Sequence, residues 1–181
     1  MLQATNTNVI AKWAEEKKLR SGTLILSREP YRHTRWAEAV TVGQLSMLRP
    51  GDELLLSARP TAYYFSYEGD LLMNTSDAAT LAYRRDGVLG ATCGTVIYEW
   101  LEPVEETTAS GIVVVRKEST KEMETRWALV HAAGPDSGVK AGDHILLAYD
   151  KDCYSIENII DGKKLHNAGK EAIVCFVQAP V

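Results

Sequence analysis

Cysteine, proline, phenylalanine and long apolar runs are all scarce in this chain of 181 residues, which has three cysteines, six prolines and two phenylalanines. The cysteines, Cys93, Cys153 and Cys175, form no Cys-x-x-Cys pair. That pattern argues against a disulfide framework or a zinc site, and it indicates buried thiols in a reducing compartment. No apolar stretch approaches membrane-spanning length, and no basic-then-apolar leader is recognisable. We therefore expect a cytoplasmic protein without a membrane partner.

An excess of positive charge is also missing. The chain has 20 Lys and Arg against 24 Asp and Glu, a net charge of −4. Nucleic-acid binding normally leaves a basic footprint, so we expect no nucleic-acid partner. An apolar content of 45% and a charged content of 24% are ordinary for a soluble protein.

Catalytic and metal-binding patterns are absent as well. The histidines, His33, His131, His144 and His166, stand in unrelated settings, and no Ser/His/Asp or His/Glu/Cys cluster is recognisable. We predict that the protein is not an enzyme and that it has no cofactor, no catalytic residue and no metal ligand.

What the chain does contain is an internal repeat. The repeat shows as four matching pairs: Val9-Ile10-Ala11-Lys12-Trp13 with Val96-Ile97-Tyr98-Glu99-Trp100, Ser21-Gly22 with Ser110-Gly111, Thr34-Arg35-Trp36-Ala37 with Thr125-Arg126-Trp127-Ala128, and Gly51-Asp52 with Gly142-Asp143. A repeat defines the structural unit before any other feature does. We predict two duplicated domains, residues 1–86 and 87–181, joined by the short connection Arg85–Gly90.

Most apolar stretches are short, rich in β-branched or aromatic residues, and bounded by turn residues. The predicted strands are Thr23–Ser27, Ala37–Val42, Glu53–Ala58, Ala62–Tyr67, Leu81–Tyr83, Thr95–Trp100, Ile112–Arg116, Trp127–Ala132, His144–Tyr149 and Ala172–Val177. Many short strands with frequent turns are typical of an all-β sandwich or barrel. Residues 11–20 are locally helix-like, but their counterpart 98–109 contains Pro103, so we predict a strand followed by an exposed loop in both.

Each half also carries a Ser-Gly pair followed by aliphatic residues within polar sequence. Glu105-Glu106 precedes the second cluster and Arg116-Lys117-Glu118 follows it. A turn before a buried strand is one interpretation. The polar flanks favour another, in which an exposed loop presents an aliphatic cluster to an apolar groove on a partner.

The order of these features resembles the GroES-type co-chaperonins, and the second half is most similar to phage-encoded head-assembly co-chaperonins. The residues that carry the resemblance are Glu105–Val114, Val130–Asp136 and Ala172–Cys175. The resemblance implies two tandem GroES-like β-barrels in a homo-oligomer that caps a chaperonin folding chamber for phage capsid proteins. By position, the docking loops are Gly22–Ile25 and Gly111–Val114.

The resemblance also implies which residues bind. The partner-binding residues would be Leu24, Ile25, Gly111, Ile112, Val113 and Val114. Edge strands would join neighbouring molecules through Val9, Ile10, Ala11, Ile173, Val174, Cys175 and Phe176. We predict that Leu81–Tyr83 pairs with Val96–Tyr98 within one chain, and that Ile173–Val177 pairs with Val9–Lys12 of another.

Two other functions remain open. The same barrels could form a phage virion component, such as a capsid decoration, vertex or connector protein. A tandem of PDZ domains is the other alternative, because Ser137–Leu146 is PDZ-like; it would require a helix within Asp152–Gly162.

Overall fold

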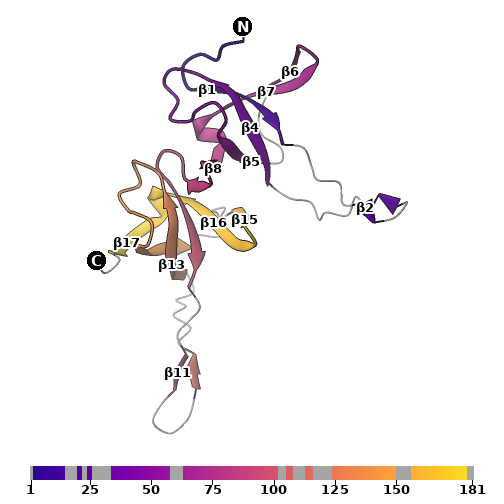
Figure 1. Ribbon diagram of the computed structural model, residues 1–181. Coiled ribbons are helices and arrows are strands. Elements are labelled where there is room, and N and C mark those ends of the chain that lie inside the picture. The colour runs from indigo at the N-terminus through magenta and orange to yellow at the C-terminus, as the bar shows by residue number, and fades with distance from the viewer. Residues whose placement is uncertain are drawn as a thin grey trace. The chain divides into compact units, whose positions relative to one another are not determined.

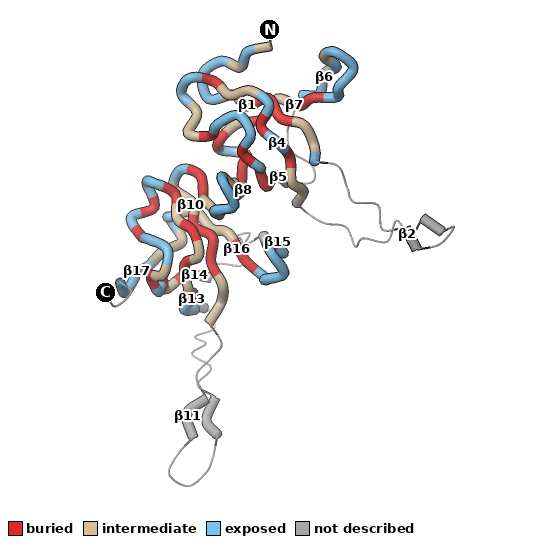
Figure 2. Tube along the Cα trace, viewed as in Figure 1, coloured by how far each residue is buried: buried red, intermediate tan, exposed pale blue. Residues whose placement is uncertain are grey.

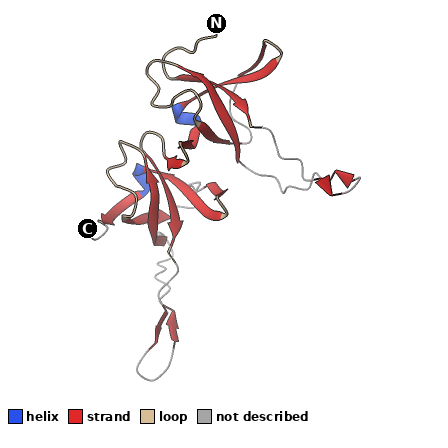
Figure 3. Cartoon of the chain, in the orientation of Figure 1, coloured by secondary structure: helices blue, strands red, loops and turns tan. Residues whose placement is uncertain are grey.

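The chain is built from β-strands, as predicted, and the all-β class is confirmed (Figures 1 and 3). The computed structural model describes residues 2–14, 20–21, 24–25, 34–57, 63–101, 105–107, 113–115, 124–149 and 156–178. Among these residues the only helical segments are two short 3-10 turns, η1 (Asp77–Ala79) and η2 (Lys170–Ala172). No helix in the described part is long and apolar enough to span a membrane.

The chain divides into two compact units, Met1–Thr92 and Cys93–Val181. The first contains a seven-stranded antiparallel sheet in the order β6-β7-β1-β4-β5-β8-β9. Its strands are β1 (Asn8–Trp13), β4 (Thr34–Val42), β5 (Glu53–Ser57), β6 (Tyr63–Tyr67), β7 (Asp70–Ser76), β8 (Thr80–Arg85) and β9 (Val88–Gly90).

The second unit repeats this topology with one strand fewer. Its sheet has the order β15-β16-β10-β13-β14-β17. The strands are β10 (Thr95–Trp100), β13 (Glu124–Ala133), β14 (His144–Tyr149), β15 (Ile156–Ile160), β16 (Lys163–Gly169) and β17 (Ile173–Val177). Even the irregularities repeat: β1 shifts register at Ile10/Ala11 and β10 shifts at the matching Ile97/Tyr98. The internal repeat in the sequence therefore corresponds to a repeated sheet.

Each unit has its own core, and buried residues recur along the strands of both units (Figure 2). The first core gathers Val9, Ala11, Ala37, Ala39, Leu48, Leu54, Leu56 and Met73. The second gathers Val96, Tyr98, Ala128, Val130, Val139, Ile145 and Leu147. Alternate residues of Leu54–Leu56 and Ile145–Leu147 enter these cores, as the two-residue period of a strand requires.

Two details of the predicted organisation differ from the structure. The predicted boundary between residues 86 and 87 falls in the turn that joins β8 to β9, and the first unit continues to Thr92. Among the described strand pairs, neither sheet closes on itself, because no pairing joins β6 to β9 or β15 to β17. A PDZ domain would need a helix within Asp152–Gly162. The described residues of that segment instead form strand β15 and the turn after it, so the PDZ alternative loses its support.

The cysteine prediction is wrong for two of the three thiols. Cys93 and Cys175 are both exposed, and neither forms a disulfide. Cys93 lies in the turn before β10, Cys175 lies on the edge strand β17, and both side chains are open to solvent there. Cys153 lies outside the described residues.

Candidate docking loops and an open strand edge

In both units the chain leaves the main sheet after the strand β1 or β10 and returns to it at the pairing strand β4 or β13. We call each of these connecting segments an excursion. Between β1 and β4 it forms a separate two-stranded sheet of β2 (Arg20–Ser21) and β3 (Leu24–Ile25). Between β10 and β13 it forms another, of β11 (Glu105–Thr107) and β12 (Val113–Val115). Neither small sheet is hydrogen-bonded to a main sheet in the described residues.

A matching pair of contacts holds the base of each excursion. The Ala14 amide donates to the Trp36 carbonyl, and the Leu101 amide donates to the Trp127 carbonyl, both at 3.1 Å. The Arg35 guanidinium lies 4.9 Å from the Trp13 ring centre. In the second unit Arg126 lies 5.0 Å from the Trp100 ring centre.

Arginine over a tryptophan face is an attractive cation–π arrangement. The sequence contains both Trp and Arg in both repeats, yet nothing in the sequence pattern indicated that they would stack across the root of the excursion. We call this stack, Trp13 with Arg35 or Trp100 with Arg126, the Trp–Arg clamp.

Four of the predicted partner-binding residues lie in these small sheets. Leu24 and Ile25 form β3, paired with Ser21 and Arg20. Val113 and Val114 belong to β12, opposite Thr107 and Glu106. Gly111 and Ile112, like Gly22, lie outside the described residues. The structure thus brings the described aliphatic residues of each cluster into a short hairpin that is separate from the core sheet.

The predicted role of Val9, Ile10 and Ala11 in joining molecules is wrong. These residues pair with β4 on one side and with β7 on the other. All three are buried. A strand with both edges paired cannot accept a further strand, so the predicted pairing with Ile173–Val177 of another molecule is not possible at this site.

The predicted pairing of Leu81–Tyr83 with Val96–Tyr98 is also wrong. Strand β8 pairs with β5 and β9. Strand β10 pairs with β13 and β16. The cause is the same in both errors: strands that the sequence did not predict, β7, β9 and β16, occupy the edges.

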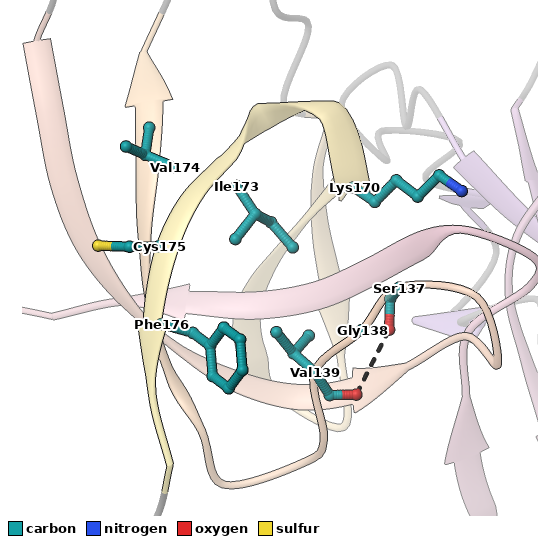
Figure 4. Close-up of a pocket in the computed structure, with 8 residues that line it drawn as sticks. All are labelled: Ser137, Gly138, Val139, Lys170, Ile173, Val174, Cys175 and Phe176. Carbon is teal, nitrogen blue, oxygen red and sulfur yellow. Dashed lines mark hydrogen bonds between the residues drawn. The ribbon is translucent and has the colours of Figure 1, made fainter.

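Ile173, Val174, Cys175 and Phe176 do lie on an edge strand, β17. It pairs with β14, and no other described strand pairs with it. Figure 4 shows a hollow beside β17 that is also lined by Ser137, Val139 and Lys170. The Ser137 hydroxyl, which lies in the loop before β14, donates to the Gly134 carbonyl at 2.7 Å and lies 3.4 Å from the Val139 carbonyl.

Potential metal-binding side chains do not gather in the described residues. Within them, no three His, Cys, Asp or Glu side chains gather in a way that could hold a metal ion. His131 does contact a carboxylate, with Nε2 3.0 Å from the Glu99 Oε2 atom, but the pair lies on neighbouring strands at the surface. No protein-family model matches the chain, and no curated protein matches it.

Proposed function

We propose that this protein is a non-enzymatic, co-chaperonin-like oligomer built from two GroES-like barrels. Its excursions at Gly22–Ile25 and Gly111–Val114 dock aliphatic clusters onto a chaperonin. The oligomer then caps a folding chamber for phage capsid proteins.

One observation carries this proposal: the same sheet carries the same excursion, rooted at the same Trp–Arg clamp, in both units. A loop that served only to connect two strands would not need a separate hairpin of its own. In the second unit the hairpin sets an aliphatic strand, Val113–Val115, against the polar strand Glu105–Thr107. An aliphatic strand outside the core sheet suits an apolar groove on a partner.

The energetics favour many weak contacts over one strong contact. Burying an aliphatic side chain contributes about 1.5–3 kcal/mol, whereas ordering a loop costs about 1–2 kcal/mol per residue. A lone two-stranded hairpin is only marginally stable in water. The strand pairing in each small sheet therefore lowers the entropy cost of ordering the loop but does not remove it. Binding therefore depends on an oligomer that presents several loops at high effective concentration.

The test is native mass spectrometry of the protein with a chaperonin, with and without ATP. We expect an ATP-dependent complex with the parent protein and loss of that complex in Val114→Asp. The control is Leu71→Asp, because Leu71 is an exposed aliphatic side chain on β7, in the sheet itself. Equal chaperonin binding by the Val114 variant and the parent would remove the loop from the mechanism.

A particle component is the competing function. Recovery of the protein in purified virions, together with no chaperonin complex, would favour a capsid decoration, vertex or connector role. The loops would then be contacts within the assembly, and Val114→Asp would reduce incorporation into particles.

A further inference from the structure

Strand β6 lies at an edge of the first sheet and consists almost entirely of aromatic residues. It reads Tyr63-Tyr64-Phe65-Ser66-Tyr67, and among the described strands it pairs with β7 alone. Tyr63 is 82% exposed, Tyr64 is 48% exposed, and Leu71 of β7 is 60% exposed. Figure 2 shows the outer end of this hairpin in the colour of exposed residues. An open apolar edge of this kind is a template for another strand.

The usual protection of an edge strand is missing from β6. Edge strands are commonly shielded by charged side chains or by proline, and β6 contains neither. Its counterpart in the second unit, β15, carries Glu157 where β6 carries Tyr64, since Glu157 lies opposite His166 as Tyr64 lies opposite Met73. The two edges have therefore diverged, and the first is the uncharged, aromatic one.

The turn of the hairpin determines which backbone groups of β6 are available. The two turn residues, Glu68-Gly69, have φ angles of 51° and 87°, which is typical of a type I′ hairpin. The residues that flank such a turn, Tyr67 and Asp70, exchange backbone hydrogen bonds, and such pairs alternate along an antiparallel ladder. The N–H and C=O groups of Tyr64 and Ser66 therefore face the open edge.

Strand β6 is also complementary to itself. When a second β6 lies antiparallel to it with Phe65 opposite Phe65, Tyr64 meets Ser66 and Tyr63 meets Tyr67. The two residues whose backbone groups face outward, Tyr64 and Ser66, then exchange hydrogen bonds. The other pairs are aromatic, and aromatic cross-strand pairs stabilise a sheet. The acidic turns of the two copies lie at opposite ends of the contact, so like charges do not meet.

Strand β15 is a poorer partner for this edge. In the corresponding antiparallel register it would set Asn158 opposite Phe65 and Glu157 opposite Ser66. An amide would replace the central aromatic partner, and a carboxylate would enter the new strand pair. The side chains of β6 therefore favour a second β6.

We propose that two copies of this chain associate through β6, so that the first sheet of one molecule continues into the first sheet of the other. Both copies use the same surface, so the contact closes as a two-fold pair and does not propagate by itself. The contact uses the strand edge alone and does not depend on what the excursions bind. The pair carries twice as many excursions as one chain, and weak contacts gain from that number.

Proline at position 66 tests the backbone contact. The Ser66 N–H faces the open edge, so Ser66→Pro removes a donor that the sheet of a single chain does not use, and proline is tolerated at such edge positions. We expect the mass of the assembly in native mass spectrometry to fall by half, with the circular dichroism spectrum unchanged. The matched control, Ser66→Ala, keeps the N–H group and should keep the parent mass. A folded Ser66→Pro protein of parent mass would overturn the proposal, and so would a monomeric parent.

Disulfide trapping tests the register with substitutions at the surface. Tyr63→Cys and Tyr67→Cys are made separately in a protein whose Cys93, Cys153 and Cys175 are replaced by serine, and one variant carries a heavy-isotope label. Antiparallel pairs without backbone hydrogen bonds have Cα atoms about 4.5 Å apart, within the range that a disulfide spans. We expect mild oxidation of the mixture to give several times more covalent dimer than either variant alone, mainly the labelled–unlabelled species.

The control mixture combines Tyr63→Cys with Ile159→Cys, because Ile159 is 69% exposed on β15. As much covalent dimer from this mixture would mean that β6 meets β15 or that the thiols collide at random, and the proposal would fail. As much dimer from Tyr63→Cys alone would mean a different register and would also overturn it. Val114→Asp, which tests the docking loop, leaves β6 unchanged, so the two proposals fail separately.

Discussion

At the scale of single residues, the first unit pairs a buried carboxylate, Asp52, with an arginine, Arg85. Asp52 is 2% exposed and accepts two hydrogen bonds from Arg85, at 2.9 and 2.7 Å. The same contact raises the pKa of Arg85, chiefly through those hydrogen bonds to Asp52. Asp52 also accepts from the Arg49 amide, so one carboxylate organises the turn that leads into β5.

Replacing Arg85 with alanine should therefore destabilise the first unit strongly. The variant leaves a buried carboxylate without its cation, which costs about 3 kcal/mol, at the lower end for a broken buried pair. Urea unfolding followed by circular dichroism would measure it. The control is Arg84→Ala, whose partner Glu53 is 54% exposed, and its cost should stay near 1 kcal/mol or below. Equal losses of unfolding free energy in Arg85→Ala and Arg84→Ala would show that the burial of Asp52 does not determine the cost.

Three tight turns share one backbone geometry, and one of them has an unfavourable residue. Glu68, Asp86 and Asp161 have φ angles of 51°, 52° and 51°, each before a glycine that also has a positive φ. Aspartate and asparagine tolerate this left-handed conformation better than glutamate does. Glu68→Asn should therefore stabilise the β6–β7 hairpin by about 0.5–1 kcal/mol.

The Glu68 variant has a second readout. The Glu68 carboxylate accepts a hydrogen bond from Tyr67 and raises the pKa of that phenol above its ordinary 10.0. Glu68→Asn removes the negative charge and should lower the pKa of Tyr67, measured by NMR titration. Asp86→Asn, in the corresponding turn of another hairpin, should change neither the stability nor the pKa of Tyr67.

At the scale of elements, the strands with clear apolar patterns were predictable and the outer strands were not. Thr95–Trp100 and His144–Tyr149 form strands with the predicted bounds. Lys163–Gly169 contains two lysines, an asparagine and a glycine, which are poor strand formers. It forms a strand because β10 and β15 pair with it on both sides. Tertiary pairing overrides local preference there.

The difficulty of predicting outer strands also explains the errors at the predicted interface between molecules. The sequence identified Ile173–Phe176 as an edge strand, and the structure places β17 at the edge of its sheet. It misassigned Val9–Ala11 because Asp70–Ser76, with Asn74, Thr75 and Ser76, does not have the pattern of a strand. The Trp–Arg clamps were missed because a cation–π contact joins residues that no local spacing relates.

The close packing of β9 gives a prediction for that element. Gly90→Val should push β9 away from β8, because the new side chain meets the Tyr83 ring. We expect faster amide hydrogen exchange in the outer edge of β8, since the β9 hydrogen bonds protect it. Val88→Thr is the control, because Val88 is 70% exposed in the same strand. Unchanged protection in Gly90→Val would mean that β9 does not cover β8 in solution.

At the scale of the whole molecule, every strand pairing among the described residues of the main sheets stays within one unit. A fragment of residues 1–92 should therefore fold alone into a soluble, β-rich protein. A fragment ending at residue 86 lacks β9 and leaves the edge of β8 bare, so it should self-associate through that edge as well. Analytical ultracentrifugation distinguishes the two, and assemblies of equal size would show that β9 has no protective role.

The register shifts that both sheets share bear on the origin of the internal repeat. Both sheets hold an extra residue at the matching place in the ladder between their first strand and its long partner, and again beside Leu55/Leu56 and Leu146/Leu147. Such bulges are retained within families as part of the fold. Two copies of one sheet would share such bends, whereas Asp77 and Arg85 of the first unit are replaced by Lys170 and Gln178 in the second.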